Sequence, residues 1–183
     1  MSIRVTPPMT VIGAELRILI DVTDEIAAGS AACAESERVM EEAMGKRVLV
    51  ERRSTDRIAP PLGMYSHAAR VSPAGAVLHI AGQVGNAPDG TIAPDAYGQT
   101  VQALRNIAAV IEDAGGTPAE GLASLFTMVT SREALPDVRR GIGEVFAEWF
   151  PEGDHPANSL CVVAGLARED LLVEIASVAV VPG

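Results

Sequence analysis

Glu174 is the residue that most directly suggests chemistry. It is the only charged side chain between Leu171 and Val181, a segment that is otherwise almost entirely apolar. A carboxylate in such a strand is costly unless it is paired or hydrogen-bonded. Two interpretations stay open. Glu174 is either a structural group held by backbone donors or by an arginine across an interface, or a catalytic group that moves protons or holds a water.

A polar stretch precedes this segment and is a second candidate for binding. Residues 155–161 read HPANSLC and lead into an apolar strand. Groups at the entry to a strand, beside a loop, are often used for binding. Ordinary loop chemistry is the alternative, and Cys161 by itself fits a small buried hydrophobic side chain.

Three further positions carry weaker signals. Tyr65, one of two tyrosines, follows a proline-rich loop and either closes a pocket or packs its ring on the core. Gly82 starts a Gly-Gln-Val-Gly sequence that can present backbone N–H groups to a ligand, although turn formation explains it equally well. Asn106 departs slightly from helix preference within a helical pattern, which indicates a hydrogen-bonding task.

The rarer residue types argue against several kinds of site. The two cysteines, Cys33 and Cys161, are far apart, and the three histidines lack the spacing of a metal site. The sequence contains no Walker loop, no complete dinucleotide-binding glycine motif and no nucleophile elbow. We therefore expect neither a metal nor a cofactor.

Net charge and hydropathy exclude several classes of binding partner. The 183 residues carry a net charge of −10 and only 3% aromatic residues, which disfavours nucleic-acid binding. No apolar run approaches the ~20 residues of a membrane helix. The first residues lack the pattern of a secretory signal. These features predict a cytoplasmic protein without a membrane or nucleic-acid partner.

Hydrophobic periodicity divides the chain after Lys46 into eight elements. Helices are expected over 101–114, ended by two glycines, and between Pro136 and Pro151. The order β-β-β-α-β-α-β-β predicts an α+β sandwich in which two helices cover one face of a mostly antiparallel or mixed sheet. The second and third strands are expected to form a hairpin around 73–75. The expected strands are 47–53, 68–72, 76–82, 121–131, 159–165 and 171–181.

The last of these strands is apolar on both sides, so the helices alone cannot cover the sheet. A partner subunit is the simplest second cover, and residues 1–45 are the other candidate. Those residues carry three positive and eight negative charges and no recognisable motif. They are expected to be an accessory extension of a domain that spans 46–183.

Four motifs taken together resemble the RidA/YjgF family, also known as the L-PSP endoribonuclease or enamine/imine deaminase family. They are MYSHA at 64–68, AGQV at 81–84, QTVQALRN at 99–106 and VEIA at 173–176. The resemblance implies a chorismate-mutase-like fold and a homotrimer with a central sheet barrel. It also implies cofactor-free ligand clefts between subunits, lined by Tyr65, Gly82, Asn106, Asn158, Ser159, Leu160, Cys161 and Glu174.

One departure from the family pattern matters for function. The family's PARS motif supplies an arginine that binds the substrate carboxylate, whereas residues 156–159 read PANS and place Asn158 there. The neutral amide of asparagine does not replace the charged, bidentate guanidinium of arginine. We therefore expect a protein that acts on or binds a small imine or enamine, with Glu174 as its catalytic group, but that deaminates 2-aminoacrylate poorly. The alternative is a non-catalytic small-molecule-binding or regulatory trimer, and an endoribonuclease fits least.

Overall fold

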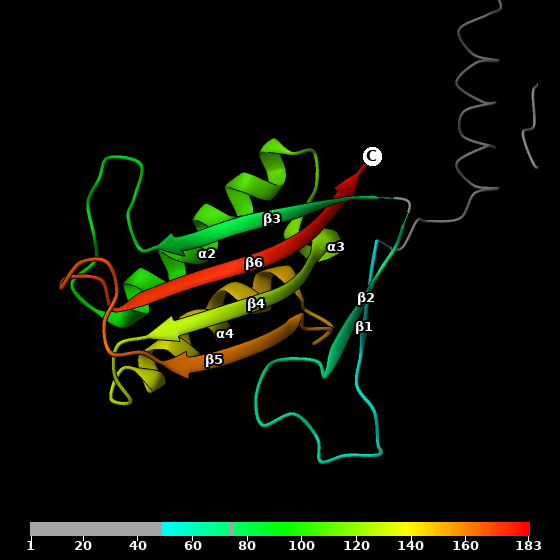
Figure 1. Ribbon diagram of the computed structural model, residues 1–183, viewed down its shortest axis with the longest axis horizontal. Helices are drawn as coiled ribbons and strands as arrows, with labels where there is room; N and C mark the ends of the chain where they lie inside the picture. Colours follow the sequence, from blue (N-terminus) through cyan, green and yellow to red (C-terminus); the bar gives the residue numbers. More distant parts are fainter. Residues whose placement is uncertain (1–48, 74) are drawn as a thin grey trace, which may run out of the picture. The chain divides into compact units, whose positions relative to one another are not determined.

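The computed structural model describes residues 49–73 and 75–183, and the expected extension over 1–45 lies outside them. Apart from the one-turn helix α3, the order of the elements confirms the expected β-β-β-α-β-α-β-β pattern and the α+β class (Figure 1). The elements are β1 (Val50–Arg53), β2 (Ala68–Val71), β3 (Gly75–Val84), α2 (Ala96–Asp113), α3 (Pro118–Gly121), β4 (Leu122–Val129), α4 (Leu135–Trp149), β5 (Ala157–Val162) and β6 (Val173–Pro182).

The strands form a mixed four-stranded sheet and a separate ribbon. The sheet order is β3-β6-β4-β5, in which only β4 and β5 run parallel. The ribbon is the antiparallel pair of β1 and β2. The predicted hairpin of 68–72 with 76–82 is therefore wrong. A side chain on Gly75 would approach Val180 to 2.4 Å, so the glycine lets β3 lie tightly against β6 instead of folding back on β2.

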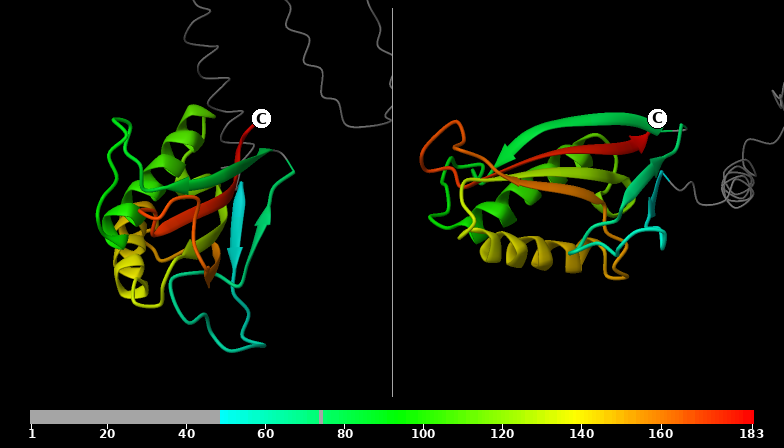
Figure 2. Two further views of the ribbon diagram at one scale, coloured as in Figure 1. Left: turned by 60° about the vertical axis from the view of Figure 1, so that its left-hand side comes forward. Right: turned by 60° about the horizontal axis from the view of Figure 1, so that its bottom comes forward.

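Both long helices pack on one face of the sheet, as Figure 2 shows. Their apolar faces meet the inward side chains of β4 and β6 in one continuous core. The largest fully buried side chains include Leu104, Ile107, Ile111, Val138, Val145 and Phe146 from the helices and Val129, Val173 and Ile175 from the strands. No helix in the described part of the chain is long and apolar enough to cross a membrane.

The opposite face of the sheet, which we call the outer face, is only partly covered. Val173 and Ile175 point toward the helices, so Glu174 and Ala176 point the other way and are half-buried. The ribbon covers one end of this face through a small apolar cluster that includes Val180. Beyond it Val77 and Phe126 remain 50% and 44% exposed. This is the apolar second face that the sequence predicts.

Arg52 ties the ribbon to the sheet. Its side chain is 4% exposed, and its two terminal nitrogens donate to Asp154 Oδ2 at 3.1 Å and to the carbonyl oxygens of Ala119 and Leu122, each at 3.0 Å. The guanidinium also lies 4.6 Å from the centre of the Phe150 ring. Together these Arg52 contacts hold the ribbon against the rest of the domain, and the ribbon in turn positions the loop that runs from β1 to β2.

Candidate functional site

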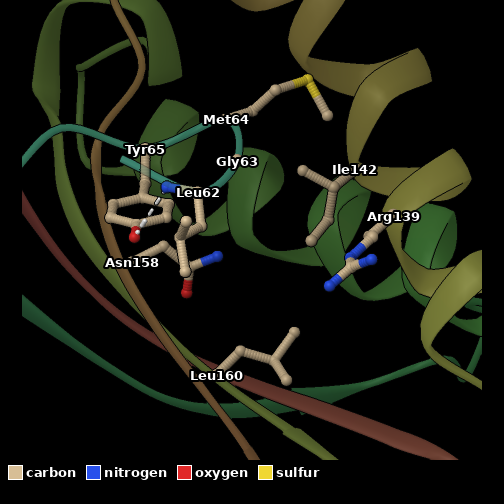
Figure 3. Close-up of a pocket in the computed structure, with 8 residues that line it drawn as sticks. All are labelled: Leu62, Gly63, Met64, Tyr65, Arg139, Ile142, Asn158 and Leu160. Atoms are coloured by element: carbon tan, nitrogen blue, oxygen red, sulfur yellow. Dashed lines mark hydrogen bonds between the residues drawn. The ribbon is translucent and has the colours of Figure 1, made fainter. Parts of the chain in front are cut away.

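A cavity of about 300 Å³ lies between α4, β5 and the loop that joins β1 to β2 (Figure 3). It brings together three residues proposed from the sequence, Tyr65, Asn158 and Leu160. The remaining lining residues, Leu62, Gly63, Met64, Arg139 and Ile142, complete its walls.

The register of β5 against β4 places Asn158 and Leu160 on the helix side of the sheet. Asn158 pairs with Leu125 and Leu160 pairs with Thr127, both of which are buried beneath the helices. The Thr127 hydroxyl donates to Asn158 Oδ1 at 3.1 Å. The Asn158 amide nitrogen is therefore the atom that faces the cavity, as Figure 3 shows.

Tyr65 is fixed by its own loop. The Leu62 N–H donates to the Tyr65 hydroxyl at 3.1 Å, and the Tyr65 N–H donates to the Gly63 carbonyl at 2.9 Å. Ser66 then attaches the loop to the chain just before β5, because its hydroxyl donates to the His155 carbonyl at 2.7 Å. The tyrosine thus forms one wall of the cavity, and its hydroxyl hydrogen stays available to a ligand.

His155, at this attachment point, lies in an aromatic cluster. Its ring stacks on Phe146, with centroids 5.4 Å apart and an angle of 24°. Burial lowers the pKa of His155 below its ordinary value of 6.5; the Asp154 charge opposes this shift and the Arg52 charge adds to it. The neutral ring is therefore the form that the fold favours.

This shift predicts an acid-sensitive corner beside the cavity. As the pH falls below 6.5, the unfolded chain takes up a proton before the folded chain does, so the free energy of unfolding decreases. The contribution of His155 to the free energy of unfolding is complete above pH 6.5, and it is lost as the pH falls toward the lower pKa of the folded state. Urea unfolding at pH 7.5 and 5.5 should show a smaller loss for His155→Phe, which keeps the ring but cannot titrate. Equal losses in both proteins would contradict the prediction.

A second group of the proposed residues lies on the outer face. The register places Glu174, Met128 and Cys161 in a row across β6, β4 and β5, and Ser159 occupies the same face next to Phe126. Gly82 completes the group.

Gly82 and Glu174 are in close contact. A Cβ on Gly82 would lie 1.9 Å from Glu174 Oε1, so a larger residue at this position would displace the carboxylate from where it lies. Within residues 49–73 and 75–183, the Glu174 carboxylate makes no hydrogen bond or ion pair. The interpretation of Glu174 as a carboxylate held by donors of its own chain therefore finds no support in this region.

Asn106 belongs to neither group. Its amide nitrogen donates to the carbonyl oxygens of Val84 at 3.1 Å and Asn86 at 3.0 Å, and its oxygen accepts from Gln102 at 2.8 Å. These bonds fix the turn that follows β3, near Gly82. A direct contact between Asn106 and a ligand stays a prediction.

Arg139 is the main feature of the cavity that the sequence did not reveal. It enters from α4, one turn before Ile142, and its guanidinium points into the cavity in Figure 3. Among the described residues it has no hydrogen-bond or ion-pair partner. The spacing of Arg139 and Ile142 places them on one helix face, but nothing in the sequence says which loop covers that face. No group of three or more His, Cys, Asp or Glu in the described ranges lies close enough to hold a metal ion.

Known proteins match both the sequence and this fold. The family model for endoribonuclease L-PSP matches residues 56–181. YyfB of Yersinia pestis, a Rid-family protein of unknown function, is 33% identical, with 73% of this chain and 99% of that chain covered and a TM-score of 0.63. The YjgF gene product of E. coli is 24% identical (71% and 98% covered, TM-score 0.53). E. coli TdcF, solved with bound serine, is 23% identical (74% and 98% covered, TM-score 0.53). The two E. coli structures show the fold alone. The family model, however, spans more than half of the sequence. The chain therefore belongs to the endoribonuclease L-PSP family, which includes the Rid and YjgF proteins.

Proposed function

We propose that this protein binds a small imine or enamine metabolite in clefts between copies of the chain, and that Glu174 directs its hydrolysis. The observation that carries the proposal is the division of the site residues between two faces of one sheet. Tyr65, Asn158 and Leu160 line the cavity on the helix side, and Glu174 with Gly82 lies on the outer face. One copy cannot bring these two groups together, whereas the outer face of a second copy can complete the cavity of the first.

The chemistry suits a lone carboxylate. An enamine first tautomerises to the imine by moving a proton from nitrogen to carbon. Water then adds to the carbon of the C=N bond, the C–N bond breaks as the added hydroxyl gives up its proton to the departing nitrogen, and the products are a ketone or 2-oxo acid and ammonia. Glu174 accepts the proton of the attacking water and returns it to the nitrogen, so no metal or redox group is needed. Membership of the family supports a role connected with small metabolites, and the serine bound to the related TdcF is one such molecule.

We propose further that 2-aminoacrylate is a poor substrate. Asn158 offers only the neutral N–H groups of its amide to a carboxylate, where an arginine would offer a charged pair. With the carbon skeleton of 2-aminoacrylate too small to make other contacts, little binding energy remains to position it.

The test is ammonia release from imines generated in the assay by an amino-acid oxidase, measured above the spontaneous rate. Glu174→Gln keeps the shape and removes the charge, and should reduce the acceleration by about 100-fold, the size of effect typical of general acid–base groups. Glu169→Gln, an exposed substitution in the loop before β6, is the matched control and should retain the wild-type rate. Full activity of Glu174→Gln would refute the assignment.

Binding without turnover is the alternative, and one observation favours it. None of the eight residues with which one copy lines the cavity carries a carboxylate, a thiol or an imidazole. If the wild-type protein binds a 2-oxo acid but does not accelerate ammonia release from any imine, the protein is a metabolite-binding member of the family.

A further inference from the structure

Two consecutive arginines on α4 have different environments. Arg140 lies over the Tyr97 ring, 4.0 Å from its centre, and pairs with Asp137 at 3.1 Å. Arg139 has no such partner in the described ranges, and its guanidinium points into the cavity (Figure 3). An arginine without a counter-ion at a concave site is suited to bind an anion, because its planar fork matches a carboxylate.

The other polar donor of the cavity faces the same space. The oxygen of the Asn158 amide is occupied by the Thr127 hydroxyl, so its nitrogen carries the free N–H groups. Arg139 and Asn158 therefore present donors from two opposite walls, α4 and β5. Within one copy of the chain, no carboxylate lines the cavity to compete for them.

The rest of the wall is apolar and partly open to solvent. Leu62 is 96% exposed, Leu160 39% and Met64 37%, and Ile142 lies at the base of the same wall. Apolar side chains that remain exposed around a cavity gain from contact with an apolar ligand. A volume of about 300 Å³ is at the lower end of small-molecule pockets, so the ligand is small.

We infer that this cavity binds a small carboxylic acid with an apolar side chain. Arg139 binds the carboxylate, Asn158 donates to it or to the adjoining 2-oxo group, and Leu62, Met64, Ile142 and Leu160 contact the tail. This inference rests on the proposed function, because a 2-oxo acid is the product of imino-acid hydrolysis. It moves the carboxylate-binding charge from β5 to α4 and makes the apolar tail the determinant of specificity.

Isothermal titration calorimetry of the full chain with 4-methyl-2-oxopentanoate and with pyruvate tests the inference. The branched acid should bind at least about 10-fold more tightly than pyruvate, since it buries more apolar carbons. Arg139→Gln should weaken binding of the branched acid by about 10- to 100-fold, as expected for loss of a charge-assisted contact. The affinity of Arg139→Lys for the branched acid should lie between those of the wild type and Arg139→Gln. Arg140→Gln removes the same charge one residue later and should bind the branched acid like the wild type.

The inference is overturned if neither acid binds, if pyruvate binds as well as the branched acid, or if Arg139→Gln binds like the wild type. These outcomes are separate from a failure of the proposed function. Ammonia release that depends on Glu174 but not on Arg139 would remove only the present inference. Acid binding through Arg139 without any ammonia release would remove only the catalytic role. Circular dichroism of each variant establishes that the fold is retained.

Discussion

Gln99→Leu is expected to lower the free energy of unfolding by about 3 kcal/mol. The Gln99 side chain is buried and makes three hydrogen bonds to the backbone. Its nitrogen donates to the carbonyl oxygens of Ala93 at 2.9 Å and Asp170 at 2.8 Å, and its oxygen accepts from the Leu172 N–H at 2.7 Å. Each such bond contributes about 1 kcal/mol, and leucine leaves all three backbone groups without their partner.

The matched control for this prediction is Gln102→Leu, the same chemical change in the same helix. Gln102 is half-buried and donates one bond, to Asn106, so its loss should cost about 1 kcal/mol. Urea unfolding followed by far-ultraviolet circular dichroism gives both values. If the two variants unfold at the same urea concentration, Gln99 is not the connection between the loop before α2 and the loop before β6 that its hydrogen bonds indicate.

Phe126→Glu is expected to abolish assembly. The proposed clefts require copies of the chain to meet through the outer face, and Phe126 lies on β4 near the middle of that face, 44% exposed. A carboxylate buried in an apolar contact costs several kcal/mol without a partner. Light scattering coupled to size exclusion should give about three times the 19.0 kDa chain mass for the wild type and a single chain mass for the variant.

Val110→Glu is the control for this experiment. Val110 is similarly exposed, at 37%, but lies on α2 in the helix layer, away from the outer face. It should leave the mass unchanged. A wild-type protein that elutes as a single chain, or a Phe126→Glu variant with the wild-type mass, would show that the outer face does not join copies of this chain. The two-face site would then need another explanation.

The element order could be predicted from the sequence because it depends on local pattern. The helical repeat from Val101 to Ile111 and the flanking glycines were sufficient for α2, although the helix begins at Ala96. The apolar repeat does not extend to the first turn, because Tyr97, Gly98 and Gln99 interrupt it. The start of the helix is marked instead by Asp95, whose carboxylate accepts from the Gly98 N–H at 2.7 Å. Similarly, Thr117 followed three residues later by Glu120 marks the short helix α3.

The candidate site was only partly predictable, since it depends on which strand lies beside which. Alternation along β5 separates Asn158 and Leu160 from Ser159 and Cys161, and this much is contained in the sequence. Which face of β5 lines a cavity depends on the pairing of β4 with β5 and on the loop that lies over α4. Neither of these is a local property of the sequence. Arg139 could not be distinguished from other surface arginines for the same reason.

The place of β6 in the sheet has a consequence for biosynthesis. β6 lies between β3 and β4, yet it follows every other described element along the chain. Helices α2 and α4 contact each other and can associate on the nascent chain, but no strand joins β3 to β4 in the sheet until β6 leaves the ribosome. At roughly 5–20 residues per second, translation from the end of β5 to the end of β6 takes on the order of seconds. During that interval the backbone edges of β3 and β4 that later pair with β6 lack these hydrogen-bond partners, and such edges can pair with other extended chains.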